Sequence, residues 1–311
     1  MARTATAQGI GGSRTARWAA VAGLAAAAAA ALAAPAPARA AEAFVGVDVT
    51  GQMVTFSSAR PQIARRRDIT GLPAGEEIVG LDVRPLTRTV VALSDASRLY
   101  TLDPVAASVT AIGTAPFAPA LVGQSFGFDF NPTVDRIRVV SNLRQNLRLN
   151  PITGATAAVD GALAYVAGDA NAGQPAGVTA SAYTNSFAGA TTTQLFGIDT
   201  VRNVLALQNP PNAGGLATVG ALGVDATSPS AFDIVNVAGG TAYAALRLAG
   251  TRGSRLYTIN LATGGATAVG PIRGATVSAL AIRGTIPLLA SKARTARRPC
   301  RAAGAGLGGR R

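Results

Sequence analysis

A short glycine-serine motif is the first place where this sequence could carry a nucleophile. Residues 123–127 read GQSFG, the G-x-S-x-G pattern of a hydrolase nucleophile elbow, which would make Ser125 the attacking group. Such a serine needs a neighbouring base, most often a histidine. The sequence contains no histidine, and its single lysine, Lys292, lies in a basic, glycine-rich C-terminal segment. A Ser–His–Asp hydrolase is therefore excluded.

Three aspartates recur at one position of a repeated segment. VGLDVRP, FGFDFNP and AFDIVN place Asp82, Asp129 and Asp233 between apolar neighbours. Three carboxylates around one axis could hold a hard cation such as Ca²⁺ through their oxygens, or another ligand. Aspartates at a repeated strand position more often hydrogen-bond backbone amides, here those of the next repeat, or pair with an arginine such as Arg84. The structural role is the favoured interpretation, and the cation or ligand site is the alternative.

Arginines gather after the second of these aspartates. In the segment FNPTVDRIRVVSN, Arg136 and Arg138 share one face of a predicted strand, and Arg148 follows nearby. These three arginines are candidates for a patch that binds a carboxylate, sulfate or phosphate on a sugar or cell-wall polymer. Pairing with Asp135 and other acids on a solvated surface is the favoured alternative.

Other motifs do not add a cofactor site. The polar loop at 168–177 offers oxygen ligands from Asp169 and Asn171, but it lacks the spacing of an EF-hand loop. The run GAGLGG satisfies G-x-G-x-x-G without a strand before it or a helix after it. With one cysteine, Cys300, and no histidine, a zinc site of the usual ligands is excluded. No cofactor is predicted, with Ca²⁺ at the three aspartates as the alternative.

The elements that must position these residues repeat with a period near fifty. Aligning the aspartate position of each repeat gives the series Asp82, Asp129, Ala182, Asp233 and Ala281. Each of the first four is followed by three further short apolar runs, separated by turn residues such as N-P, D-P, T-G and G-G. Four short strands per unit at this spacing predict the blades of an all-β propeller.

The two ends of the repeated region supply one more blade. Residues 43–71 hold three strands without a first one, and residues 279–284 hold a first strand without successors. Joined, they close the ring and hide its strand edges. The sequence therefore predicts five four-stranded blades, with six as the alternative if the loop at 160–178 conceals strands.

The N-terminus has the parts of a secretory signal. Residues 1–40 contain arginines, an uncharged alanine-rich run at 18–34 and the small-x-small site Ala38-Arg39-Ala40. This pattern predicts a signal peptide cleaved before Ala41 and export by the general secretory route to an extracellular or periplasmic location. No transmembrane segment is expected after cleavage.

Charge is unevenly distributed along the chain. The signal region carries four arginines, and the residues after 287 carry seven lysines and arginines without an acid. The second group predicts a basic, disordered tail at 287–311. The net charge of +13 less these eleven charges leaves +2 for the propeller domain at 41–286, so its net charge does not indicate a nucleic-acid partner.

Several long segments of the body resemble one protein family. The run SFGFDFNPTVDRIRVVSNLRQNLRLNPITG is the most specific, and TGLPAGEEIVGLDVRP, GDANAGQPAGVTASAYTNS and LYTINLATGGATAVG support it. They are similar to the exported bacterial family known as domain of unknown function 4394, over residues 44–271. The resemblance implies a secreted, propeller-like bacterial protein and supplies no catalytic residues.

Two classes of function follow from these observations. The favoured one is a monomeric, non-catalytic propeller that binds an unidentified ligand or cell-envelope component through its channel mouth or end loops. The alternative is a propeller enzyme of the lactonase or lyase type, which would use the channel carboxylates with a divalent cation.

Overall fold

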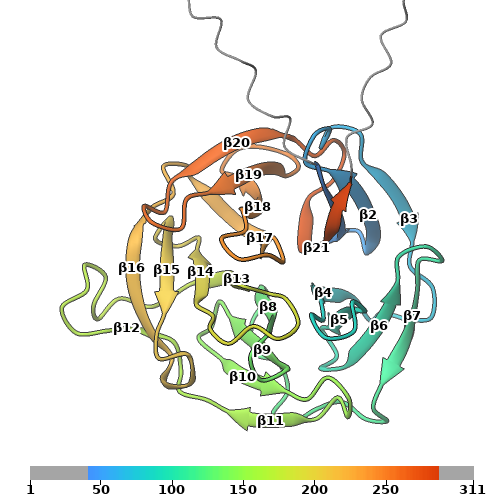
Figure 1. Cartoon of the computed structure of the whole chain (residues 1–311), viewed down its shortest axis with the longest axis horizontal. Coiled ribbons are helices and arrows are strands. Elements are labelled where there is room, and N and C mark those ends of the chain that lie inside the picture. The colour runs from blue at the N-terminus through green and yellow to red at the C-terminus, as the bar shows by residue number, and fades with distance from the viewer. Residues whose placement is uncertain (1–40, 287–311) are drawn as a thin grey trace, which may run out of the picture. The chain divides into compact units, whose positions relative to one another are not determined.

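The computed structural model describes residues 41–286, which form five antiparallel sheets arranged as the blades of a ring (Figure 1). The fold is a five-bladed β-propeller, as the repeats predict. The predicted signal peptide at 1–40 and the predicted tail at 287–311 lie outside the described residues. Within the described part of the chain, no helix is long and apolar enough to cross a membrane.

Each blade is a meander whose first strand lies next to the central channel (Figure 1). Blade 2 consists of β4 (Ile78–Val83), β5 (Val90–Ser94), β6 (Leu99–Asp103) and β7 (Ser108–Ile112). Blade 3 consists of β8 (Phe126–Asn131), β9 (Arg136–Ser141), β10 (Asn146–Leu149) and β11 (Thr156–Val159). Blade 5 consists of β17 (Ala226–Ile234), β18 (Ala242–Leu248), β19 (Arg255–Ile259) and β20 (Ala266–Pro271).

Blade 4 carries one additional short strand. Its strands are β13 (Val178–Tyr183), β14 (Leu195–Asp199), β15 (Val204–Gln208) and β16 (Gly215–Ala221), and the short 3-10 helix η1 (Pro211–Ala213) precedes the last of them. The two-residue strand β12 (Ala164–Tyr165) adds to the outer edge in parallel with β16. The loop at 160–178 therefore contributes to blade 4, and the alternative of six blades is wrong.

Blade 1 joins both ends of the described chain. Its inner strand is β21 (Val277–Ile286), followed outward by β1 (Ala41–Asp48), β2 (Gln52–Ser57) and β3 (Arg65–Asp68). The β1–β21 ladder runs from the pair Ala41 and Ile286 to the pair Asp48 and Val277. The predicted closure of the ring by the two ends is confirmed, and it pairs edges that would otherwise be open.

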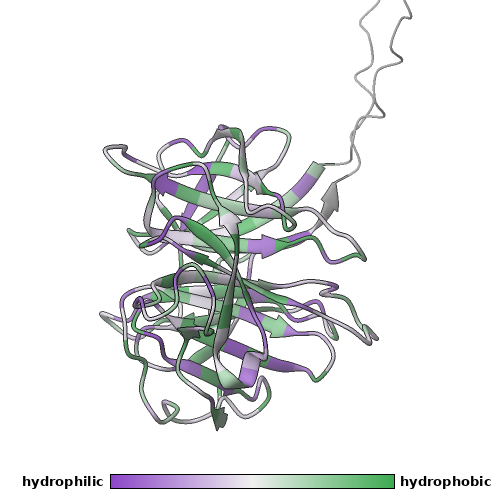
Figure 2. Cartoon of the chain, turned by 90° about the vertical axis from the view of Figure 1, so that its left-hand side faces the viewer, coloured by the Kyte–Doolittle hydropathy of each residue, from purple (hydrophilic) through white to green (hydrophobic). Residues whose placement is uncertain are grey.

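The core lies between neighbouring blades because alternate residues of each strand point to opposite sheet faces. Phe126, Phe128 and Phe130 of β8 pack against Val91 and Leu93 of blade 2. The residues between them, including Asp129, point toward blade 4. Figure 2 shows the resulting interleaving of hydrophobic and hydrophilic residues along the strands.

Glycines at the ends of the fourth strands let neighbouring blades approach closely at the rim. A Cβ added at Gly113 would lie 2.4 Å from the carbonyl oxygen of Thr153, and one at Gly220 would lie 2.2 Å from that of Thr263. Each of these carbonyls belongs to the turn between the third and fourth strands of the next blade. Gly113 and Gly220 therefore have a packing role.

Candidate functional site

The channel brings together the three aspartates that the repeats align. Asp82, Asp129 and Asp233 come from the inner strands β4, β8 and β17, and one carboxylate oxygen of each lies within 4.8 Å of the others. Each residue is 1% exposed. We call these residues the aspartate ring.

Each aspartate of the ring accepts a hydrogen bond from the backbone of the next blade. The bonded atoms are one oxygen of each carboxylate and the N–H that follows the aligned position: Phe130 N to Asp82 Oδ2 at 2.7 Å, Tyr183 N to Asp129 Oδ1 at 3.1 Å and Ile282 N to Asp233 Oδ2 at 2.6 Å. The aspartates therefore join blade 2 to 3, blade 3 to 4 and blade 5 to 1. Arg84, which the sequence offered as an ion-pair partner for these aspartates, pairs with Asp135 instead.

In blades 2 and 5 the equivalent N–H has no aspartate in the preceding blade, which has alanine at the aligned position. These two N–H groups bond to the aspartate of their own blade instead. Val83 donates to Oδ1 of its neighbour Asp82 at 2.5 Å, and Ile234 donates to Oδ1 of Asp233 at 2.6 Å. Three carboxylates thus satisfy the equivalent N–H group in all five blades. An unpaired N–H in this position would be costly because it is buried. This geometry supports the structural role of the aspartates.

Burial raises the pKa of every carboxyl group in the ring. Loss of hydration raises the pKa of Asp82 to about 7, although hydrogen bonds from Phe130 and Val83 oppose the shift. The pKa of Asp129 is raised well above its usual range by burial and by the two neighbouring carboxylates, and that of Asp233 by burial and by Asp82. Burial therefore favours the protonated form of these carboxyl groups.

The channel beside the ring has almost no free space. A cavity of about 10 Å³ lies among the inner strands, which is the space of about one water molecule. Ligand pockets for small molecules are typically ~300 Å³ or more. Three carboxylates are suitable ligands for a hard cation, but five of their six oxygens already accept backbone hydrogen bonds.

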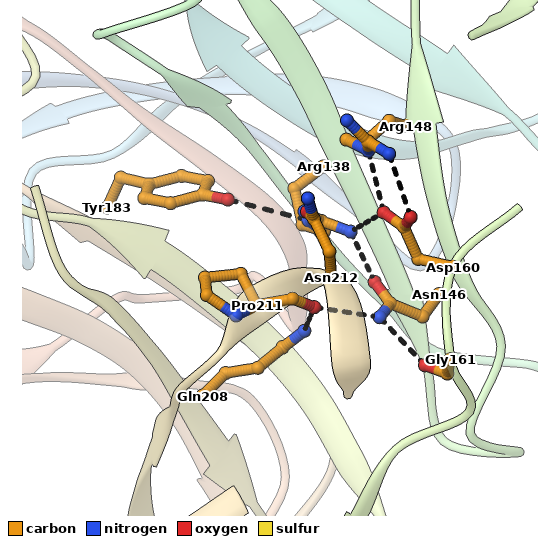
Figure 3. A network of polar contacts seen from close by, with 9 residues as sticks. All are labelled: Arg138, Asn146, Arg148, Asp160, Gly161, Tyr183, Gln208, Pro211 and Asn212. Carbon is orange, nitrogen blue, oxygen red and sulfur yellow. Dashed lines mark hydrogen bonds and ion pairs between the residues drawn. The ribbon is translucent and has the colours of Figure 1, made fainter. Parts of the chain in front are cut away.

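A second candidate site lies between blades 3 and 4 (Figure 3). Strand register places Arg138 opposite Asp129 on one side and Arg148 on the other, so their side chains share the face toward blade 4. A cavity of about 130 Å³ lies against this face. We call it the arginine cleft, and its lining residues are Asn131, Val134, Arg136, Arg138, Arg148, Tyr183 and Asn212.

Arg138 forms the floor of the arginine cleft and is only 2% exposed. Its Nη1 donates to Asp160 and Asn146 at 2.5 and 2.7 Å, and its Nη2 donates to Asn212 at 2.7 Å (Figure 3). A long contact of 3.4 Å joins its Nε to the Tyr183 hydroxyl. Arg138 thus pairs with an acid, as expected, but the acid is Asp160 rather than Asp135, and the expected solvated surface is wrong because Asp160 and blade 4 enclose the side chain.

Arg136 and Arg148 retain donors that no described residue uses. Arg148 binds Asp160 through Nε and Nη2 at 2.7 and 2.9 Å, which raises the arginine's pKa and leaves its Nη1 without an acceptor. Arg136 donates only from Nη1, to the carbonyl of Asp135. Both side chains are partly exposed and line the cleft.

A neighbouring cavity extends the arginine cleft along blade 4. It has a volume of about 230 Å³ and shares Asn131 and Tyr183 with the cleft. We call it the amide pocket because its polar lining is uncharged and rich in amides: Asn131, Tyr183, Thr193, Gln194, Gln208 and Asn209.

Several residues of the cleft could not be found from local sequence patterns. Asn212 lies 74 positions from Arg138, directly after Pro210 and Pro211. Asp160 and Asn146 complete the cage around the guanidinium group. Their partners become visible only when blades 3 and 4 are packed together.

The remaining motif residues make structural contacts. Ser125 is 6% exposed, and its hydroxyl contacts that of Ser228. Asp169 accepts hydrogen bonds from Asn171 and from both the backbone and hydroxyl of Thr218, so it holds its loop against β16. No base lies beside Ser125 in these contacts, in agreement with the absence of histidine.

Five meander blades closed by the chain ends define this protein as a five-bladed β-propeller. A family scan matches residues 52–281 to "Domain of unknown function (DUF4394)". The chain belongs to this family. A comparison with curated proteins finds no significant match.

The solved structures that resemble this chain have low sequence identity to it. A chain of a nidogen/laminin complex shares 12% identity and a TM-score of 0.46, with 79% of this chain and 99% of that one covered. Myxococcus xanthus glutaminyl cyclase shares 12% identity and a TM-score of 0.40, with 67% and 83% covered. At these identities and TM-scores, the role of neither protein can be transferred to this one.

Proposed function

We propose that this protein is a non-catalytic binding propeller that holds an anionic ligand in the arginine cleft. One observation carries the proposal: three guanidinium groups line the cleft, and none of its lining residues is acidic. Asp160 behind them offsets one positive charge, and Asp135 is paired with Arg84. The three arginines and Asp160 together therefore leave a net charge of +2 at the cleft, and Arg136 has no carboxylate partner among the described ion pairs.

The cleft is organised before any ligand arrives. Asp160 binds Arg148 through two parallel hydrogen bonds and also fixes the buried Arg138, so the orientation of both guanidinium groups is set. Guanidinium groups suit carboxylates and phosphates because their planar N–H pairs match two oxygens. Preorganisation of this kind lowers the entropy lost on binding.

The alternative of a lactonase or lyase would place catalysis at the aspartate ring. That chemistry needs a substrate within hydrogen-bond reach of a carboxylate. The ring is buried beside a cavity of about 10 Å³, and five of its six oxygens accept hydrogen bonds from backbone N–H groups. These facts support binding at the arginine cleft over catalysis in the channel.

We further propose that the mature protein is an exported monomer that meets its ligand outside the cytoplasm. The signal-like residues 1–40 support export. A cell-envelope or extracellular component that carries carboxylate or phosphate groups is consistent with this location and with the charge of the cleft.

Calorimetry with three small probes tests the proposed site. Galacturonate and inorganic phosphate supply the two anionic groups, and galactose is the neutral counterpart of galacturonate. We expect at least one anion to bind and galactose not to bind. The double variant Arg136→Gln/Arg148→Gln should weaken binding by roughly 10- to 100-fold, because each charge-assisted hydrogen bond contributes about 1.5–3 kcal/mol.

A matched control comes from arginines outside the cleft. Arg144 and Arg252 are exposed, and Arg144→Gln/Arg252→Gln removes the same charge without touching a lining residue. This control should bind like the wild type. Failure of both anions to bind, or equal loss in the two double variants, would show that the cleft is not the binding site.

A further inference from the structure

Four cavities lie at the same end of the propeller, where the inner strands leave the channel. The arginine cleft and the amide pocket contain the last residues of β8 and β13, Asn131 and Tyr183. Cavities of about 410 and 450 Å³ contain Val83 at the end of β4 and Arg283 of β21. We call this end of the ring the exit face.

The two larger cavities are also lined by arginines. Arg283 lines both of them, Arg88 lines the first, and Arg60 and Arg65 line the second. All four residues are exposed, and within residues 41–286 none forms an ion pair with a carboxylate. Arg88 donates instead to the carbonyl of Arg283 at 2.9 Å, across the boundary between blades 2 and 1.

Acidic residues are concentrated at the opposite end. The acids on or directly behind the exit face are Asp103, Asp135, which is bound by Arg84, Asp160, which is bound by Arg138 and Arg148, and Glu42, which is 7% exposed. The loops and strand ends at the other end hold the larger group: Asp48, Asp68, Glu76, Glu77, Asp95, Asp169, Asp199 and Asp225. A body with a net charge near zero thus has a strongly basic exit face.

We infer that the ligand of the arginine cleft is an acidic polysaccharide, which lies across the exit face with acidic groups on the arginines and sugar hydroxyls in the amide pocket. This inference rests on the proposed function and extends it from a single anion to a class of polymer. The cleft accounts for one acidic sugar, and Arg60, Arg65 and Arg283 account for further ones.

The lining of the amide pocket indicates a sugar. Amides and hydroxyls such as Gln194, Asn209 and Thr193 both donate and accept hydrogen bonds, which suits neighbouring hydroxyl groups. The pocket adjoins the arginine cleft through two shared residues, Asn131 and Tyr183. A ligand that fills both must therefore carry an anion beside a group of hydroxyls.

The exit face is less suited to nucleic acid. Proteins that bind single strands stack bases on exposed aromatic rings. Within the described residues, every aromatic side chain except the partly exposed Phe187 is buried. The phosphates of a nucleic acid would find arginines here, whereas its bases would find no platform.

Both ends of the described chain lie at the exit face, and the sequence that follows Ile286 is basic. The pair Ala41 and Ile286 marks where the described chain begins and ends, at the exit face. From residue 288 onward the sequence carries seven lysines and arginines and no acid. Long-range attraction of a polyanion increases with each such charge and weakens with salt.

Oligomer length is the variable that tests this inference. Binding to the mature protein is measured for galacturonate, for its eight-unit oligomer, for a neutral maltooligosaccharide of the same length and for an oligothymidylate of matching charge. We expect the acidic octamer to bind at least tenfold more tightly than the monomer. The neutral oligomer should not bind, and the oligothymidylate should bind at least tenfold more weakly than the octamer.

Variants far from the cleft separate the inference from the proposed function. Arg60→Gln/Arg65→Gln/Arg283→Gln should weaken octamer binding about tenfold and leave monomer binding unchanged. The matched triple variant Arg144→Gln/Arg252→Gln/Arg273→Gln, at the opposite end, should leave both unchanged. All six side chains are exposed, so folding is expected to be retained.

The outcomes distinguish the two levels of the argument. If the octamer binds no more tightly than the monomer, or the Arg60/Arg65/Arg283 variant has no effect, the polysaccharide inference fails and the anion site stands. Equal binding of oligothymidylate would replace the polysaccharide with a nucleic acid. If the monomer does not bind and Arg136→Gln/Arg148→Gln changes nothing, the proposed function itself fails.

Discussion

Replacing Asp129 should remove one hydrogen bond between blades 3 and 4, and an aspartate introduced in blade 4 should restore an acceptor for the same N–H. The N–H of Tyr183 donates to Asp129 Oδ1 at 3.1 Å. Its own blade has Ala182 at the aligned position, so Asp129→Ala leaves this N–H without an acceptor. Asp129 and Tyr183 are both at least 99% buried, so this N–H loses its partner away from bulk solvent.

The loss of stability follows from the free-energy cost of one unpaired buried donor. Asp129→Ala should lower the free energy of unfolding by about 1–3 kcal/mol. Above about pH 4 the substitution also removes the free-energy cost of the raised pKa of Asp129, which offsets part of this loss, so the comparison is made at pH 4, where the unfolded state keeps its proton as well. Urea unfolding at constant pH measures the change.

A second substitution should rescue the first. An aspartate bonds to the N–H that follows it at Asp82 and Asp233, at 2.5 and 2.6 Å, so Ala182→Asp can accept from Tyr183 in the same way. Ala182→Asp should destabilise the wild type, where it adds a fourth buried carboxyl, and stabilise Asp129→Ala. The double-mutant cycle should show a coupling of about 1 kcal/mol or more.

Ala281→Asp provides the matched control. It occupies the other alanine position, but the neighbouring N–H groups of Val83 and Ile282 already have acceptors. It should not rescue Asp129→Ala. The reasoning is refuted if Ala182→Asp is destabilising in both backgrounds, or if Ala281→Asp rescues equally well.

Four further predictions concern stability. Burial and neighbouring carboxylates raise the pKa of Asp129, so the folded state keeps a proton that the unfolded state loses above about pH 4, and this contribution to stability falls as pH rises. Asp129→Asn keeps an acceptor for Tyr183 and should flatten the dependence of the urea midpoint on pH between 4 and 7; an unchanged slope would contradict the raised pKa. Arg138→Gln should cost about 3 kcal/mol in urea unfolding, because it removes one partner of a buried ion pair while Arg148 still binds Asp160; a loss below 1 kcal/mol would show that the buried pair is unimportant. Gly220→Ala should cost about 1–3 kcal/mol, since its Cβ would lie 2.2 Å from a backbone oxygen, whereas Gly265→Ala meets nothing closer than 3.5 Å and should be near neutral. Chelator should leave the melting temperature unchanged if the aspartate ring is structural, and stabilisation by added Ca²⁺ would favour the cation site.

The blades and the aspartate ring could be predicted because repetition carries their signal. A repeat aligns residues that occupy equivalent positions, so Asp82, Asp129 and Asp233 were placed on one axis before any contact was known. Closure of blade 1 followed from the missing strands at each end, and the β1–β21 pairing confirms it. Each inference needed only the order and spacing of apolar runs.

The arginine cleft was only partly predictable because its contacts break the repeat. Arg136, Arg138 and Arg148 stand out as an unusual local cluster, but nothing in the repeat shows that Asp160 binds two of them. Asn212 reaches Arg138 from another blade through a turn specific to blade 4. Burial of Arg138 depends on this non-repeating contact, which is why a solvated surface was the wrong expectation.

The two alanines at the aligned position explain why three aspartates are enough for five blades. The N–H after each aligned position can be satisfied by an aspartate of its own blade or of the preceding one, as the five observed bonds show. Under this rule no two neighbouring blades can both have alanine, and a ring of five then needs at least three aspartates. Ala182 and Ala281 are in blades 4 and 1, which blade 5 separates. The chain therefore has the smallest number of buried carboxyls that leaves no N–H unpaired, which keeps their mutual repulsion and desolvation low.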